Sequence, residues 1–186
     1  MISKEKFQKT SNLLINYVTI VLGGMFSLLG NMTTAMGEAF STVVVPKESR
    51  EEVKKKIREQ VNPMFTEMVK NILKMRRSIY PLIKKKEKKI RKMLNEEVCD
   101  RGIAIVEKYS FERPAFTEKL GNKDVAYYVQ LMHKQDPKFG EMLQELSGWM
   151  NSDQNAKIIE AILPVPPAQE TTSKKTKTAQ KKHQPL

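Results

Sequence analysis

The feature that most limits how this chain can fold is an N-terminal stretch without charged residues. Lys9 and Glu38 are separated by 28 uncharged positions, and the most apolar part runs from Leu13 to Leu29. A membrane-spanning helix needs about 20 mainly apolar residues, so the stretch is long enough to cross a bilayer. Asn16 and the interspersed glycines and threonines lower its hydrophobicity. We expect a transmembrane helix here, with a buried central helix and a cleaved signal peptide as alternatives.

Small residues recur along the same stretch at helical spacing. Glycines stand seven positions apart, and a serine or threonine follows each of them four residues later. On a helix these residues form a stripe along one face, and such stripes allow two helix backbones to approach closely. The stripe therefore predicts a helix-association surface, used in a homo-oligomer, formed by Gly23, Ser27, Gly30, Thr34 and Gly37.

The second segment, residues 47–108, has the pattern of long amphipathic helices. Pro46 interrupts the first helix, and Ser49 followed by Glu52 predicts a capping box at the start of the next. Apolar residues then recur every three or four positions from Val53 to Leu82, close to the seam of a coiled coil, which offers a second oligomer interface. Pro63 is predicted to begin a new helix, and Pro81 to end or kink it near Tyr80. We expect two or three basic helices, either end to end or folded back as a hairpin.

Positive charge is concentrated in residues 74–92 of a chain whose net charge is +12. Glu87 is the one acidic residue among these nineteen positions. A dense positive block attracts polyanions, such as the nucleic-acid backbone or an anionic lipid surface, whereas the alternative is a solvated helix face. The predicted polyanion-binding residues are Lys74, Arg76, Arg77, Lys84, Lys85, Lys86, Lys88, Lys89, Arg91 and Lys92.

The C-terminal part changes character. Residues 109–163 are mildly acidic and predict a small bundle of short helices, with helix starts near Asp124, Asp136 and Ser152. From Pro164 to Leu186 the chain is rich in Pro, Thr, Gln and Lys and almost without apolar residues, which predicts a disordered basic tail.

Residue types needed for catalysis are sparse. Cys99 is the one cysteine, and the two histidines are His133 and His183. No phosphate-binding loop, zinc-peptidase motif or nucleophile elbow is present in the sequence. Glu96, Glu97 and His133 could form a catalytic group only if the fold brought them together. We expect no enzyme activity, catalytic residue, cofactor, metal or small-molecule substrate.

The sequence therefore predicts an all-α protein in four segments. These are an N-terminal hydrophobic helix, long basic amphipathic helices that are kinked at prolines, a short-helix bundle and a tail, over residues 1–46, 47–108, 109–163 and 164–186. The predicted function is that of a single-pass membrane scaffold, with its basic part in the cytoplasm, that engages anionic lipid, nucleic acid or an acidic partner. The alternative is a soluble cytoplasmic protein of the nucleic-acid-coating or virion type, with residues 13–45 buried in its core or in an oligomer interface.

Overall fold

A computed structural model describes residues 1–113 and 115–151 of the chain. The described residues form five α-helices and one short 3-10 helix, so the fold is all-α as the sequence predicts. The helices are α1 (Lys4–Val44), α2 (Arg50–Met93), α3 (Glu96–Glu107), α4 (Asn122–His133) and α5 (Pro137–Met150), with η1 (Lys47–Ser49) between the first two. The predicted helix near Ser152 and the predicted tail lie outside the described residues.

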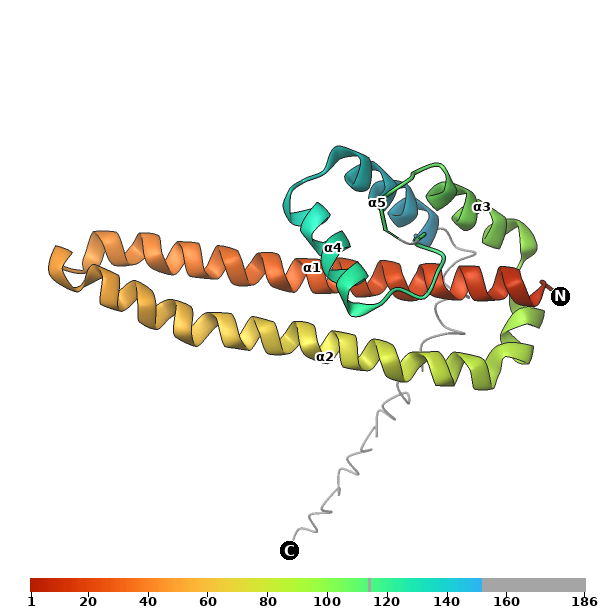
Figure 1. Cartoon of the computed structure of the whole chain (residues 1–186), viewed down its shortest axis with the longest axis horizontal. Helices are drawn as coiled ribbons and strands as arrows, with labels where there is room; N and C mark the ends of the chain where they lie inside the picture. Colours follow the sequence, from red (N-terminus) through yellow and green to blue (C-terminus); the bar gives the residue numbers. More distant parts are fainter. Residues whose placement is uncertain (114, 152–186) are drawn as a thin grey trace, which may run out of the picture.

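Two long antiparallel helices form the frame of the molecule. Helices α1 and α2 run side by side along their length and are joined by the tight turn at Pro46 and η1 (Figure 1). The short helices α3, α4 and α5 lie on the other side of α1, over its N-terminal half (Figure 1). Helix α1 is therefore covered on two sides near the N-terminus. The remainder of the hairpin, residues 25–70, projects beyond α4 and is called the arm below.

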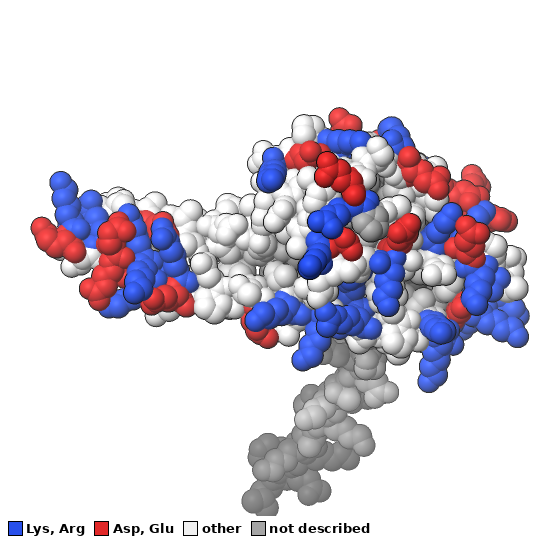
Figure 2. Space-filling model, viewed as in Figure 1, with Lys and Arg blue, Asp and Glu red and all other residues white. Residues whose placement is uncertain are grey.

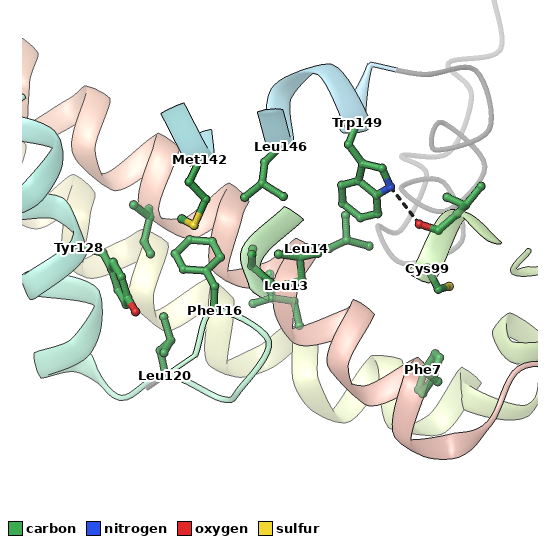
Figure 3. Packing of buried hydrophobic residues seen from close by; sticks show 14 of the residues in the cluster. Phe7, Leu13, Leu14, Cys99, Phe116, Leu120, Tyr128, Met142, Leu146 and Trp149 are labelled. Atoms are coloured by element: carbon green, nitrogen blue, oxygen red, sulfur yellow. Dashed lines mark hydrogen bonds between the residues drawn. The ribbon is translucent and has the colours of Figure 1, made fainter. Parts of the chain in front are cut away.

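The hydrophobic core lies where α1 meets the short helices. Leu13 and Ile20 of α1 are fully buried, as are Tyr128 of α4 and Phe139 of α5. Figure 3 shows Phe116, from the segment between α3 and α4, packed among these helices. The rings of Phe116 and Tyr128 meet edge to face with their centroids 5.2 Å apart. The first half of the uncharged stretch is thus core, which matches the predicted alternative of a buried central helix.

Helix α5 is fixed to α3 by a tryptophan. The Nε1 atom of Trp149 donates a hydrogen bond to the carbonyl oxygen of Val98 at 3.0 Å (Figure 3). The indole lies against Gly102, where a Cβ atom would come within 2.4 Å of the ring. A glycine is needed at this position because any side chain would overlap the tryptophan.

Most helix boundaries agree with the sequence signals. Helix α1 ends just before Pro46, and Ser49 takes the N-cap position of α2, although its side chain makes no capping hydrogen bond. Asp124 closes a capping box at the start of α4 by accepting from the N–H of Gly121 at 2.8 Å. Asp136 caps α5 by accepting a hydrogen bond from the N–H of Phe139, also at 2.8 Å.

The prediction that Pro63 begins a new helix was wrong, and of the two effects predicted for Pro81, a helix end or a kink, the helix end does not occur. Helix α2 continues through both Pro63 and Pro81, and no new helix starts at Pro63. Both prolines lie on the exposed side of α2. There, water can satisfy the carbonyl groups that a proline leaves without a hydrogen-bond donor. Residues 50–107 form two helices, α2 and α3, within the predicted number of two or three, and α2 folds back on α1.

Candidate anion-binding surface

The basic residues of α2 gather on the side that faces away from the core. An α-helix turns by about 100° per residue, so residues 74–92 can be placed around its axis. The buried residues Ile72, Ile83, Ile90 and Leu94 fall on one side. Seven exposed cations fall opposite them, within a sector of about 140°. These seven define the basic face: Lys74, Arg77, Lys84, Lys85, Lys88, Lys89 and Lys92.

No side chain of the basic face forms an ion pair with a carboxylate of the described residues. Lysines at the tip of the arm differ, because Lys54, Lys55 and Lys56 each lie within 4.0 Å of a glutamate on the same helix. Figure 2 shows the contrast, with blue and red mixed at the tip and mainly blue along the lower edge of the body, where α2 runs. The basic face therefore carries positive charge that the described part of the chain leaves unneutralised.

Three of the ten predicted polyanion-binding residues lie off this face. Lys86 is exposed but stands to one side of the sector. Arg91 is half-buried, and its Nε donates to the carbonyl oxygen of Ile2 at 3.0 Å. Arg76 is buried, with 4% of its surface exposed. Arg76 lies among basic residues in the sequence, but on the helix it shares the face of Ile72 and Ile83. This helical spacing is the signal that distinguishes Arg76 from the exposed basic residues.

Arg76 belongs to a buried polar cluster between α1 and α2. Its Nη2 lies 3.1 Å from Oδ1 of Asn16 and 2.6 Å from the carbonyl oxygen of Leu120. Asn16 also donates to the carbonyl oxygens of Phe116 and Glu118, at 2.6 and 2.7 Å. The hydroxyl of Tyr80 lies 3.3 Å from the same Nη2, and burial raises the pKa of this phenol. The cluster joins α1, α2 and the segment before α4.

The stripe of small residues lies partly against α2 of the same chain. A Cβ atom at Gly30 would come within 2.8 Å of the Phe65 ring, and one at Gly37 within 3.0 Å of Ile57. Thr34 lies beside Asn62, with its hydroxyl 3.1 Å from Oδ1. Ser27 lines the same recess as Gly30. Gly23 is buried, but a Cβ there would meet no atom within 4 Å.

An apolar stripe remains exposed on the arm. Several large side chains of α1 that follow the core segment are about half exposed or more, and they recur every three or four residues. These are Met25, Leu29, Met32, Met36, Phe40 and Val43. Figure 2 shows the middle of the arm as a white band between the charged tip and the body. Helix α1 is long and apolar enough to cross a membrane, and half of its most apolar window is buried inside the protein.

The possible catalytic group of Glu96, Glu97 and His133 is not assembled. Glu96 pairs with Lys6 at 2.9 Å, and the hydrogen bonds of that lysine to Asp100 and, to a lesser extent, to Glu96 raise its pKa. His133 lies beside the carbonyl oxygen of Gly24, at 3.4 Å. Lys6 and Gly24 are separated by about 27 Å along α1, at about 1.5 Å per residue. The fold therefore holds the histidine and the glutamates at opposite ends of the body.

Comparison of the chain with protein-family models, with curated proteins and with solved structures finds no significant match.

Proposed function

We propose that this protein is a non-enzymatic helical scaffold that binds the phosphate backbone of nucleic acid through the basic face of α2. The observation that supports this proposal is the set of seven exposed cations that no carboxylate of the described residues neutralises. They extend over residues 74–92, about 27 Å of helix, a length along which a duplex carries many phosphates. Aromatic residues are absent from the basic face, which favours contact with the backbone over stacking on bases.

An anionic membrane surface is the competing polyanion, and the packing of α2 argues against it. A helix that lies in a membrane interface inserts its apolar side among the acyl chains. In α2 the centre of that side is occupied, because Ile83 and Ile90 are buried against the rest of the protein. The exposed apolar residues Met75, Leu82 and Met93 form only a narrow edge beside the basic face. Binding through this helix would then be electrostatic, which suits the rigid, closely spaced phosphates of a duplex.

The test compares two triple variants of α2 in binding to a 20-base-pair duplex at several salt concentrations. Lys85, Lys88 and Lys92 lie at or near the centre of the basic face, so K85Q/K88Q/K92Q should reduce the slope of log affinity against log salt by about 3. The control, K54Q/K55Q/K56Q, removes the same charge from lysines that are already ion-paired, and it should bind nearly as the unaltered protein does. Equal losses in the two variants would reject the basic face as the site. Binding to anionic vesicles without binding to the duplex would reject nucleic acid as the partner.

A second candidate function is attachment to a membrane through the arm. The supporting observation is the exposed apolar stripe of α1, from Met25 to Val43, on a helix of sufficient length and hydrophobicity to cross a bilayer. Extraction of the full-length protein from a membrane fraction with carbonate and with high salt tests this function. Retention in the membrane supports attachment through the arm. Complete release, with the protein soluble without detergent, contradicts it and leaves self-association as the use of the stripe.

A further inference from the structure

A recess with an unusual lining lies between α2 and the start of α4. Its volume is about 660 Å³, within the range of pockets that hold small ligands. Tyr80, Leu120 and Asp124 contribute to its wall. Asp124 is the one acidic residue of the lining. The basic residues of the lining number five, and they are Arg76, Arg77, Arg113, Lys119 and Lys123.

The buried member of this group, Arg76, has no charged partner in the part of the chain that the structure describes. Each of the atoms that its Nη2 contacts is a neutral oxygen, from Asn16, Tyr80 and Leu120. Its Nε is buried and has no hydrogen-bond partner among the described residues. Burial of a charged group is costly unless the group is paired and its hydrogen bonds are made. The guanidinium of Arg76 therefore lacks an anion in the described structure, and it lines the recess.

The acidic residue of the lining does not supply this anion. One carboxylate oxygen of Asp124 accepts from the backbone N–H of Gly121 at 2.8 Å, and the other lies 3.7 Å from Nη1 of Arg113. Its role is to cap α4. The cap leaves the first N–H groups of this 12-residue helix near the recess, and a helix N-terminus favours negative charge.

The mouth of the recess carries exposed positive groups. Lys119 and Lys123 are both exposed and form no ion pair with the described residues. The ammonium of Lys119 lies 4.9 Å from the centroid of the Tyr80 ring, and the guanidinium carbon of Arg76 lies 5.6 Å from the same centroid. The Tyr80 ring thus contacts one exposed and one buried cation.

We propose that this recess binds the phosphate group of a small ligand, with Arg76 at its base and Lys119 and Lys123 at its mouth. A phosphate has several oxygens that can accept hydrogen bonds from donors on different sides. The lining of the recess has four more positive than negative charges, which favours an anion of this kind. The volume exceeds that of a phosphate ion, so the ligand carries the phosphate on a larger group. This site is distinct from the basic face and does not depend on the proposed function, although Arg77 borders both.

The experiment measures phosphate binding by the full chain at constant ionic strength. Inorganic phosphate, glycerol 3-phosphate and a nucleoside 5′-monophosphate are titrated separately by calorimetry, with chloride as the balancing anion. Glycerol 3-phosphate or the nucleoside monophosphate should bind more tightly than inorganic phosphate, because each carries its phosphate on a larger group. K119Q/K123Q should weaken the binding by about tenfold or more, because each charged hydrogen bond contributes on the order of a factor of ten. Both residues are exposed, so this variant is expected to fold normally.

The control variant K85Q/K88Q removes the same charge from the basic face, outside the recess, and should bind the phosphate compounds as the unaltered protein does. No saturable binding of any of the three compounds, or equal weakening in both variants, would overturn the proposal. The two sites are separable, because loss of duplex binding in K85Q/K88Q/K92Q with unchanged phosphate binding would leave the recess intact.

Discussion

Asn16 of α1 and Arg76 of α2 meet in the interior of the protein, with 3.1 Å between Oδ1 and Nη2. Asn16 is fully buried in a stretch that is otherwise suited to a bilayer. Its amide nitrogen also holds two carbonyl groups of the segment before α4. This one polar residue thus joins α1 to α2 and to the connection between α3 and α4. Its hydrogen bonds explain why a buried asparagine is compatible with an apolar helix.

Replacement of Asn16 should destabilise the whole body. In N16A the guanidinium of Arg76 and the carbonyl groups of Phe116 and Glu118 each lose a buried partner. Each such loss costs about 1–3 kcal/mol, so the free energy of unfolding should fall by about 3 kcal/mol or more. Urea unfolding followed by circular dichroism measures this change. The control is N31A, at an exposed position on the same helix, and equal stability of the two variants would contradict the role of the cluster.

The glycines of α1 should respond differently to alanine. A methyl group at Gly30 would lie 2.8 Å from Cγ and 2.9 Å from Cβ of Phe65, atoms close to the α2 backbone. Overpacking of this kind costs about 1–3 kcal/mol, more than alanine gains by its higher helix propensity. G30A should therefore unfold at lower urea concentration than the unaltered protein.

The matched variant is G23A, where the methyl group meets no atom within 4 Å. Here the helix propensity of alanine acts alone, and stability should rise by up to about 1 kcal/mol. A result in which G30A is as stable as G23A would show that α1 and α2 are not held as closely as described.

Cys99 should be protected from thiol reagents while the protein is folded. Its side chain is fully buried, and this burial raises the pKa of the thiol, so the reactive thiolate is disfavoured. We expect the rate of modification at pH 8 to be at least about a hundredfold slower than in urea, because opening of the core costs on the order of 3 kcal/mol or more. Comparable rates in both solutions would place the cysteine at the surface.

The same cysteine gives a dependence of stability on pH. A thiol whose pKa is higher in the folded than in the unfolded protein binds more protons when folded. Its contribution to stability is therefore complete below an unfolded pKa of about 8.5, and it is lost as pH rises through the higher folded value. C99S should show a smaller fall in unfolding free energy than the unaltered protein between pH 8 and pH 10.

Substitutions in the exposed apolar stripe of the arm should change the free energy of unfolding very little. Met36 and Phe40 are 70% and 69% exposed, so M36S/F40S should change the free energy of unfolding by less than about 0.5 kcal/mol per residue. In contrast L13A, in the core part of the same helix, should cost about 2–5 kcal/mol. The arm variant should nevertheless weaken any membrane attachment or self-association of the full-length protein. A large loss of stability in M36S/F40S would indicate that the stripe is covered.

The sequence was sufficient for the fold class and for most helix boundaries, because local signals determine both. Asp136 followed by Pro137 gives the start of α5 directly, and Pro46 gives the turn of the hairpin. A helix start at Pro63 and a helix end at Pro81 were wrongly expected, because the effect of a proline depends on which side of the helix it occupies. That side is fixed by the partner helix, which the local pattern does not identify.

The register of α2 against α1 could also not be predicted from the local sequence pattern. The apolar spacing suggested that Met75 and Leu82 share the seam, yet they are 47% and 45% exposed. Ile72 of the predicted seam is buried, but after it the buried positions run one residue later, through Arg76 and Ile83. An arginine in the seam is unexpected from its residue type, and it is explained by the neutral oxygens that α1 and the segment before α4 offer to it. For this reason the recess beside Arg76 could not be predicted from the sequence.

The uncharged middle of the arm has a consequence for handling the molecule. Contacts made there bury apolar surface, and salts that are excluded from protein surfaces, such as sulfate, strengthen them. Contacts made by the basic face weaken as ions are added. A change of buffer should therefore move the protein between two modes of association, one dominant in dilute salt and the other in concentrated sulfate, without any change in its sequence.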